Sequence, residues 1–436
     1  METSSPVQAG TEVAAASAAS ESHFNVQSMQ TVTDPMRPEL PRPRVMPPPR
    51  SILIYSPQFN TIGGVETHLV RLSCFLAKRN CRVTLVTTSG MLEEARVQKL
   101  TSEGVEFIAP PGGTLSVPRK MAWLAWLVAT QLRRRHWDVI YTNAQGSLSW
   151  LLYPLKRQGV RLVHHYHTAG DERDQSTWGS LFPRWLKAVD EIVACSKSTA
   201  HNLRRVLPAN HLIGRGGWDK LRVIPYLSAG IAPSPRRVPR EPGTKLRFGF
   251  VGRLVEGKGI DTICELSRDP QLADIEWHIH GCGTDYDAAH FEQYPNVRYH
   301  GRYNGSAELA SILARLDALV LFSRYQEGQP ISLIEGMSAG LPWVATDQGG
   351  TSELMWSPSN CRLVSAECRL SKARGAVLDL AQAIRDGRTS MTAQRGAYDD
   401  HLAPEIVGER WLEFLATEAP PHLDLLDQPM PVMKFQ

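Results

Sequence analysis

The sequence has 436 residues, of which 42% are hydrophobic and 21% charged, as in a globular chain long enough to form two domains. Its seven cysteines are scattered without a C-x-x-C pair, so neither a zinc site nor a disulfide framework is favoured, and a reducing cytoplasm fits best. No basic segment precedes an apolar core at the N-terminus, as a signal peptide requires, and the longest apolar run, residues 121–130, is too short to span a bilayer.

Charge is distributed unevenly along the chain. Residues 51–245 contain 27 Lys and Arg against 13 Asp and Glu, whereas residues 246–436 contain 17 against 26, although the whole chain carries a net charge of only +4. A basic half joined to an acidic half predicts that the basic half contacts an anionic partner, such as a phospholipid surface or a phosphorylated acceptor. Ordinary charge scatter is the alternative interpretation. We expect no nucleic-acid partner.

The N-terminal 50 residues differ in composition from the rest. Residues 1–50 are rich in Ala, Ser, Thr and Pro and contain few large apolar side chains, so we expect a disordered lead. Residues 51–56 then form a continuous apolar run, which is typical of a buried parallel strand. Gly63 and Gly64 follow, and a helical periodicity begins after them. A strand, a glycine loop and a helix in this order predict backbone N–H groups that approach a phosphate or an acceptor.

Predicted strands and helices alternate through the first half of the chain. The strands lie at residues 82–87, 105–108, 139–142, 161–164, 191–194 and 221–225. Alternation of this kind predicts an α/β fold with a doubly wound parallel sheet, in which ligands bind at the carboxyl ends of the strands. Ser196 is the expected N-cap of the helix after the strand at 191–194.

The segment 119–137, RKMAWLAWLVATQLRRRHW, carries Trp and Leu between Lys and Arg at both ends. An interfacial membrane helix has this pattern, and so does a helix buried against a sheet. Apolar residues cover most of the circumference, which favours the buried helix. The cluster Arg133, Arg134 and Arg135 could still contact lipid headgroups.

Three histidines, His164, His165 and His167, lie at the end of the strand that starts at residue 161. Their spacing matches no familiar metal motif, so a metal site is the minor interpretation. In a strand, His165 and His167 share one face and His164 points to the other. A hydrogen-bonded core residue is the favoured interpretation of His164.

A second domain begins after a proline-rich segment, residues 232–245, which predicts a linker between domains at 51–231 and 246–402. Its first strand, residues 246–251, leads into a glycine loop that carries Arg253 and Lys258. Two cations on a strand-end loop can neutralise a leaving nucleotide diphosphate without a metal ion.

The same loop nearly completes a P-loop, because Gly252 and Gly257-Lys258 have the required spacing. Gly259, however, stands where Ser or Thr should hold magnesium, which argues against a nucleotide hydrolase. Further strands are predicted at residues 297–300, 317–322, 343–346 and 362–364, and an amphipathic helix at 403–416.

Two carboxylates frame the stretch of residues 323–354. Glu327 lies in a loop after a strand, and Glu335 lies in the helix that Pro330 begins and Gly340 ends. The free N–H groups at the start of that helix favour an anion in the same crevice. The whole arrangement predicts a seat for a sugar attached to a phosphate.

Glu327 and Glu335, with seven residues between them, resemble the E-x7-E signature of the retaining GT-B glycosyltransferases of family 4, or glycosyl transferases group 1. The run EGQPISLIEGMSAGLPWVATDQGGTSEL is similar to the family's E-G-F-P-x-x-L-L-E-A-M-A-x-G-x-P-V-V-A-T-x-x-G-G-x-x-E. The family's S-P-x-x-G-G-x-E and V-G-R-L-x-x-x-K-G runs also have counterparts, so the resemblance covers roughly residues 51–417.

Two departures from the family pattern are visible. Gln329 stands where the family often has an aromatic or aliphatic residue, and this change bears on the donor-sugar pocket. The family's I-P-N-G-V-D run reads VIPYLSAGI here, so its Asn-Gly turn is missing at Tyr226 and Leu227. We assign no role to those two residues.

The resemblance implies a GT-B fold of two Rossmann-like doubly wound domains facing across a cleft, with the helix at 403–417 crossing back to the first domain and a loose tail at 418–436. It implies retaining transfer of a sugar from a nucleoside-diphosphate sugar to an acceptor hydroxyl, with no metal ion and no other cofactor. Glu335 would bind the ribose hydroxyls, Glu327 would orient the sugar or stabilise positive charge at the anomeric carbon, and His167 would line the sugar.

The same resemblance assigns Arg253 and Lys258 to the donor diphosphate, aided by backbone groups at Gly63, Gly64, Ile331 and Ser332. A saccharide or lipid-linked acceptor in cell-envelope or exopolysaccharide synthesis is expected, at a cytoplasmic site that includes the inner face of the membrane. Two alternatives stay open: a P-loop-like nucleotide hydrolase, and a non-catalytic GT-B protein that binds sugar or lipid.

Overall fold

The computed structural model describes residues 49–57, 63–89, 94–111, 115–143, 147–167, 181–206, 217–228, 231 and 243–416. They all fall within one compact unit, Pro43–Gln436. The predicted disordered lead up to residue 48, the linker residues 232–242 and the tail residues 418–436 lie outside the described residues. In the described part of the chain, no helix combines the length and the apolar character needed to cross a membrane.

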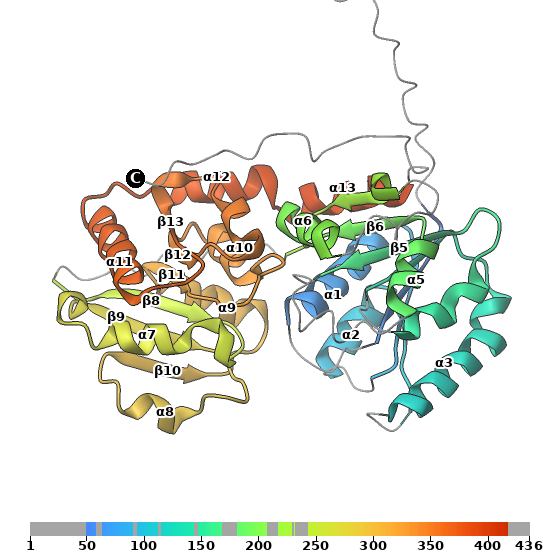
Figure 1. The fold of residues 1–436 in the computed structure, drawn as a ribbon, viewed down its shortest axis with the longest axis horizontal. Coiled ribbons are helices and arrows are strands. Elements are labelled where there is room, and N and C mark those ends of the chain that lie inside the picture. The colour runs from blue at the N-terminus through green and yellow to red at the C-terminus, as the bar shows by residue number, and fades with distance from the viewer. Residues whose placement is uncertain are drawn as a thin grey trace, which may run out of the picture. The chain divides into compact units, whose positions relative to one another are not determined.

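Seven parallel strands form the first sheet, in the order β3-β2-β1-β4-β5-β6-β7, and Figure 1 labels β5 and β6 of this sheet next to each other. The strands are β1 (Ser51–Ser56), β2 (Arg82–Thr87), β3 (Glu106–Ile108), β4 (Val139–Thr142), β5 (Arg161–Tyr166), β6 (Glu191–Ala194) and β7 (Leu221–Val223). Strand β1 pairs with β2 on one side and with β4 on the other. Every residue of β1 is buried, as expected for a central parallel strand covered on both faces.

Six parallel strands form the second sheet, in the order β10-β9-β8-β11-β12-β13. They are β8 (Leu246–Val251), β9 (Ile275–His280), β10 (Val297–Gly301), β11 (Ala318–Leu321), β12 (Trp343–Thr346) and β13 (Cys361–Val364). The strand order reverses between β8 and β11, which pair directly. Loops that leave neighbouring strands at such a switch point diverge and open a ligand site. The loops carrying Lys258 and Glu327 follow these two strands.

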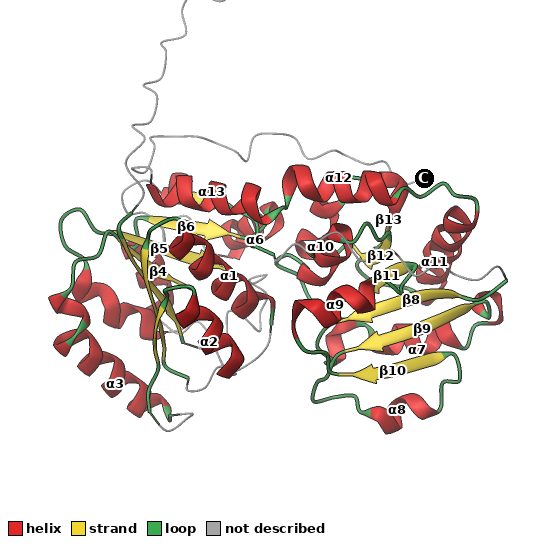
Figure 2. Ribbon diagram, turned by 180° about the vertical axis from the view of Figure 1, so that it is seen from behind, coloured by secondary structure: helices red, strands yellow, loops and turns green. Residues whose placement is uncertain are grey.

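Helices flank both sheets (Figure 2). The α-helices are α1 (Gly64–Lys78), α2 (Glu94–Ser102), α3 (Val117–Thr130), α5 (Leu181–Ala188), α6 (Lys197–Val206), α7 (Ile260–Ser267), α8 (Ala288–Glu292), α9 (Gly305–Leu313), α10 (Ile331–Ser338), α11 (Leu370–Arg385), α12 (Met391–His401) and α13 (Pro404–Ala416). Short 3₁₀ segments are η1 (Leu132–Arg134), η2 (Ser147–Leu155), η4 (Gly217–Lys220), η5 (Glu256–Lys258), η6 (Pro270–Leu272), η7 (Gly349–Leu354) and η8 (Pro358–Asn360). The two parallel sheets with flanking helices confirm the predicted α/β fold class.

Most predicted strand boundaries agree with the structure. The observed β2, β4, β6, β8 and β12 begin and end at the predicted residues. The strand predicted at 221–225 stops at Val223, two residues before Pro225. Pro225 lacks the N–H that a further ladder bond requires, and its carbonyl instead accepts a hydrogen bond from Trp411 Nε1 at 3.0 Å.

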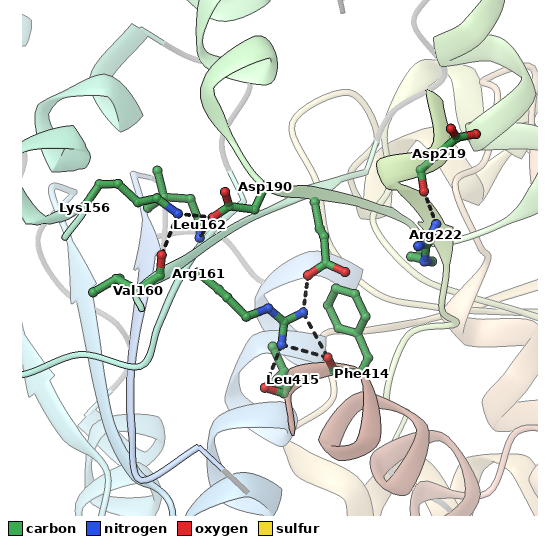
Figure 3. A network of polar contacts seen from close by, with 10 residues as sticks. Lys156, Val160, Arg161, Leu162, Asp190, Asp219, Arg222, Phe414 and Leu415 are labelled. Carbon is green, nitrogen blue, oxygen red and sulfur yellow. Dashed lines mark hydrogen bonds and ion pairs between the residues drawn. The ribbon is translucent and has the colours of Figure 1, made fainter. Parts of the chain in front are cut away.

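Helix α13 packs into the core of the first sheet. Its residues Val407, Trp411 and Leu415 are buried in the same apolar cluster as side chains of β1 and β2. Arg161 of β5 donates to the carbonyls of Phe414 and Leu415 at 2.9–3.1 Å, as Figure 3 shows. A cation that binds the last carbonyls of a helix satisfies groups with no partner inside the helix and complements its dipole.

The interpretation of residues 119–137 as a helix buried against the sheet is only partly right. Leu124, Leu127 and Val128 of α3 are buried, because they face the core. Trp126 is 53% exposed and Val117 is 61% exposed. The helix therefore has one buried side and one exposed side that still carries large apolar residues.

Candidate active site

The loop after β8 brings two of the predicted donor-binding cations to the carboxyl end of the second sheet. Arg253 is exposed, and Lys258 lies in η5 with a side chain that is 20% exposed. Gly259 follows with φ of 76°, a left-handed conformation that favours glycine. A Cβ at this position would lie 2.1 Å from the carbonyl oxygen of Phe322. The position of the P-loop Ser or Thr therefore has no room for a side chain, which argues strongly against the nucleotide hydrolase.

Glu327 lies in the loop between β11 and α10 and faces Lys258. Lys258 Nζ donates to Glu327 Oε1 at 2.6 Å, so the two predicted site residues form a charge-assisted hydrogen bond. The backbone N–H of Gly350 donates to the carbonyl of Glu327 at 2.8 Å and ties the loop to η7. A carboxylate and an ammonium group therefore stand together at the switch point of the sheet.

The glycine pair before α1 lies against the start of α10. A Cβ at Gly64 would lie 3.2 Å from Ile331 Cδ1, and a Cβ at Gly63 would lie 3.9 Å from Arg253 Cζ. Ile331 and Ser332 are the first two residues of α10, where backbone N–H groups have no partner inside the helix. The structure thus brings together Gly63, Gly64, Arg253, Ile331 and Ser332, which are predicted to hold a diphosphate. Lys258, the remaining residue of that set, lies on the same loop as Arg253.

Glu335 has a different partner from Glu327. Its Oε1 accepts from Arg71 Nη2 of α1 at 3.3 Å, and the two side chains are 8% and 17% exposed. Burial raises the pKa of the Glu335 carboxyl, and the Arg71 guanidinium opposes this shift. Glu335 is thus a buried acid whose charged form depends on one cation from the first sheet's α1.

His167 follows β5, and its backbone lies directly against the Glu327 loop. A Cβ at Gly328 would lie 2.5 Å from the carbonyl oxygen of His167, so only glycine permits this approach. The Nδ1 atom of His167 shares a hydrogen bond of 3.0 Å with the Tyr226 hydroxyl. Its Nε2 atom is buried, with no hydrogen-bond partner in the described residues. The two predicted catalytic residues, Glu327 and His167, therefore belong to touching loops.

The imidazole of His167 is neutral at neutral pH. Burial, with His68 and His164 nearby, lowers the pKa of His167 well below its usual value. If the Tyr226 hydroxyl donates to Nδ1, then Nε2 carries the proton and can donate to a bound hydroxyl. His164 is a core residue as predicted, because it is fully buried and its Nδ1 shares a 2.9 Å hydrogen bond with Thr142 Oγ1.

Several residues with roles at this site were missed by the sequence analysis. Glu353 accepts from the backbone N–H groups of Lys197 and Ser198 at 2.9 and 2.7 Å, so it caps α6 from η7. Glu353 lies inside the motif G-G-x-x-E, and this motif could have identified it from the sequence. Ser196 is the N-cap as predicted, since its Oγ accepts from Thr199 N–H at 3.0 Å.

Arg71 and His68 were also missed. Leu227 N–H donates to His68 Nδ1 at 2.9 Å, and Arg71 binds Glu335. Both lie on α1, where two polar residues three apart interrupt a run of buried apolar side chains. That interruption was the only local signal, because the partners lie far away in the sequence.

Comparison with known families gives a match in each half of the chain. The family described as "Glycosyltransferase Family 4" matches residues 62–225, and the family described as "Glycosyl transferases group 1" matches residues 245–386. The chain is 23% identical over 322 residues to the 2-deoxystreptamine N-acetyl-D-glucosaminyltransferase of Niallia circulans, over 67% of this chain and 82% of that protein.

Solved structures share the fold. HepE of Anabaena, in complex with UDP and glucose, superposes with a TM-score of 0.65 at 15% identity, over 84% of this chain and 99% of that one. Sucrose-phosphate synthase of Thermosynechococcus elongatus superposes with a TM-score of 0.67 at 17% identity, over 84% and 98%. These likenesses, with the two parallel sheets, show a two-domain GT-B fold.

Proposed function

Because this chain belongs to the glycosyltransferases of family 4 and group 1, we propose that it moves a hexosyl group from a UDP-sugar to an acceptor hydroxyl with retention of configuration. The observation that carries the proposal is the 2.6 Å contact between Lys258 Nζ and Glu327 Oε1 at the switch point of the second sheet. The contact supports the proposal because an ammonium group suited to a leaving phosphate lies beside a carboxylate suited to the sugar.

We assign binding of the donor diphosphate to Arg253 and Lys258. Within the described residues, the Arg253 guanidinium makes no hydrogen bond or ion pair, so its donors are available to bind an anionic ligand. Gly64 lies against Ile331, and the N–H groups of Ile331 and Ser332 at the start of α10 add partial positive charge. Two cations and a helix N-terminus stabilise a leaving diphosphate, so we propose a reaction that needs no metal ion.

Transfer itself breaks the bond between the anomeric carbon and the phosphate oxygen and forms a bond to the acceptor oxygen. The acceptor's proton passes to the leaving phosphate, which Lys258 and Arg253 stabilise. Glu327 stabilises positive charge at the anomeric carbon, and His167 donates from Nε2 to a sugar hydroxyl. Glu335 binds the ribose through Oε2, which takes no part in the 3.3 Å contact of Oε1 with Arg71.

The choice of UDP rests on the relatives. The similar HepE structure holds UDP and glucose, and the similar Niallia circulans enzyme is named for transfer of N-acetylglucosamine. Those facts concern the relatives, and they support a UDP-hexose as the first donor to test here.

For the acceptor, we propose a lipid-linked saccharide at the inner face of the cytoplasmic membrane, in envelope or exopolysaccharide synthesis. We define the α3–η2 patch as the exposed large apolar residues of these two packed elements: Val117, Met121, Trp126, Trp150 and Tyr153. The same stretch of chain, residues 117–157, also carries exposed cations, namely Arg119, Arg133, Arg134 and Arg157. Exposed apolar side chains together with cations suit a surface of anionic lipid, because the cations attract headgroups and the aromatic rings enter the interface.

The donor assignment is tested by thermal stabilisation with UDP-, GDP- and ADP-sugars, each with and without EDTA. A bound donor raises the melting temperature. We expect a shift with UDP-sugars alone, insensitive to EDTA and lost in Lys258→Ala. Lys245→Ala is the control, because Lys245 is exposed and binds Asn296 away from the loop. A shift that needs ATP and magnesium would point to a hydrolase instead.

Turnover separates an enzyme from a binding protein. With the preferred donor and a lipid-linked saccharide, release of UDP should accompany a new glycosidic bond, and NMR of the product should show the donor's anomeric configuration. Donor binding without any consumption across acceptors would support the non-catalytic alternative. An inverted product would reject the retaining mechanism while leaving the transferase assignment intact.

Membrane binding is tested by sedimentation with phosphatidylcholine vesicles, with and without phosphatidylglycerol. We expect binding only to the anionic vesicles, weakened by salt and by the double change Trp126→Ser and Arg133→Ser. Trp356→Ser is the matched control, since Trp356 is 50% exposed but lies outside the patch. Equal binding to both vesicles, or no binding, would reject this surface.

A further inference from the structure

Three histidines converge at the outer edge of the second sheet, away from the three that the sequence analysis considered. His278 and His280 lie two residues apart on β9 and therefore share one face. Strand β10 is the edge strand next to β9, as Figure 2 shows. His300 lies on β10, and the register between β9 and β10 shifts at this residue. Such a bulge re-aims a side chain. One ring nitrogen from each histidine lies within 4.8 Å of the other two.

The three rings are arranged in a nearly parallel stack. The His280 and His300 ring centroids lie 4.2 Å apart, and the planes of all three rings agree within 8°. His278 Nδ1 lies 3.0 Å from His300 Nε2. One hydrogen bond therefore joins His278 to His300, and ring stacking joins His280 to His300.

A carboxylate stands behind the cluster. Glu276 Oε2 lies 3.1 Å from His278 Nε2, the ring atom on the far side from His300. This contact holds the proton on Nε2 and leaves the lone pair of Nδ1 directed at the cluster. Metal-binding histidines typically donate their second N–H to a carboxylate in this way, which fixes the tautomer and raises ligand basicity.

Charged side chains lie near the cluster. The nearby cations are Arg247, Arg298 and Arg315. Two of them face carboxylates: Arg298 donates to Glu276 Oε1 at 2.9 Å, and Arg247 lies 3.6 Å from Asp317.

We propose that His278, His280 and His300 form a site for a divalent transition-metal ion, with Zn²⁺ as the best fit and a fourth position open to solvent. Imidazole nitrogens suit zinc, and tetrahedral bonds of about 2.0–2.1 Å place ligand nitrogens about 3.4 Å apart. Because the rings are nearly parallel and imidazole lone pairs lie in the ring planes, binding an ion requires the His280 and His300 rings to turn until their nitrogens point at it. The site is separate from the diphosphate site and does not depend on the proposed transfer reaction.

Binding of the ion would fasten the edge strand to the site loops. Gly281 follows His280, and its N–H donates to the carbonyl of Gly301 at 2.8 Å, directly after His300. A Cβ at Gly281 would lie 1.8 Å from the carbonyl of Gly252, the residue before Arg253. The metal would therefore join the ends of β9 and β10 where they contact the cationic loop.

The test uses the full chain without a polyhistidine tag, stripped with EDTA and dialysed. We expect one equivalent of Zn²⁺ to bind in calorimetry, Co²⁺ to give the intense visible bands of a tetrahedral site, and Zn²⁺ to raise the melting temperature. His300→Ala should weaken Zn²⁺ binding by more than the roughly tenfold to hundredfold that loss of an outer partner causes. His136→Ala is the control, because its side chain is 77% exposed and lies on the first domain.

The outcomes are distinguishable. Absence of stoichiometric Zn²⁺ binding, or binding that His300→Ala leaves unchanged, overturns the proposal. Equal weakening by His136→Ala identifies surface binding only. His300 lies at an exposed edge, so His300→Ala should have the same melting temperature as the parent chain in EDTA. If its melting temperature is lower, Zn²⁺ binding is compared between the parent chain and His278→Ala instead. Donor-induced stabilisation in EDTA should be the same in all these variants, which keeps the result independent of the transferase proposal.

Discussion

The backbone N–H of Tyr226 donates to the side-chain Oε1 of Gln329 at 2.7 Å. Both positions depart from the family pattern, since Tyr226 replaces the Asn of an Asn-Gly turn and Gln329 replaces an apolar residue. The two departures meet across 103 positions of sequence, and one satisfies the buried donor of the other. Tyr226 also holds His167 through its hydroxyl, so the pair links the Glu327 loop to the proposed sugar site.

Replacing Gln329 by Leu should destabilise the protein, although Leu is closer to the family pattern. The change leaves the buried N–H of Tyr226 without an acceptor, which costs about 1–3 kcal/mol. Chemical denaturation measures the loss. Gln98→Leu is the control, because Gln98 is exposed and should stay within about 0.5 kcal/mol. An unchanged Gln329→Leu variant would mean that the hydrogen bond contributes nothing to stability.

Gly259→Ser completes the P-loop pattern, yet we expect an unstable protein with no magnesium-dependent hydrolysis. The new Cβ would lie 2.1 Å from the backbone oxygen of Phe322, at a φ of 76°. Gly387→Ser is the matched control, since Gly387 has φ of 65° and open space around it. The control isolates the conformational cost, about 1 kcal/mol. A melting temperature for Gly259→Ser equal to that of Gly387→Ser would contradict the close contact.

Arg71→Met should lose about 3–5 kcal/mol of stability at neutral pH, because it leaves the buried Glu335 without its cation. Burial raises the pKa of Glu335, so this group favours the folded state most below its unfolded pKa, and that contribution is lost as pH rises through the folded pKa. The variant should therefore lose stability more steeply with rising pH in the acid range. The double variant with Glu335→Gln should recover most of the loss, whereas Arg388→Met, at an exposed pair, should change little.

Acid should destabilise the protein from about pH 6.5 downward, because histidines are buried in the neutral form. Burial lowers the pKa of His164 to about 3 and that of His68 to about 3. Their stabilising contribution is present above the unfolded pKa and is lost as pH falls toward the folded pKa, by up to about 1.4 kcal/mol per pH unit for each group. In His164→Asn the slope of unfolding free energy against pH should be shallower, and in the exposed control His136→Asn unchanged. Parallel slopes for all three proteins would contradict the assignment.

The predictable part of the fold consisted of strands with continuous apolar runs. The bounds of β8 and β12 followed from the sequence because each is a short buried run followed by a glycine or polar turn. The exposed side of α3 was not predictable, since Trp126 has the composition of a core residue and only the tertiary arrangement leaves it exposed.

The candidate site also has a part that the sequence predicts and a part that it does not. Lys258 and Glu327 were each identified from a local motif, but their contact depends on β8 and β11 being neighbours in the sheet. Arg71 and Glu335 are 264 positions apart, and nothing local to either residue specifies the other. Long-range pairs of this kind come from packing between helices and loops of the two sheets, which periodicity and motif spacing do not contain.

Helix α13 has a consequence for how the protein is made. Trp411 packs against Tyr141 and His165 in the core of the first sheet, although it belongs to the last described helix. A ribosome therefore releases the first sheet long before it supplies the side chains that finish its core. Until α13 is synthesised, the apolar face of the first sheet that this helix covers stays exposed. A chain cut after residue 402 would keep that face exposed.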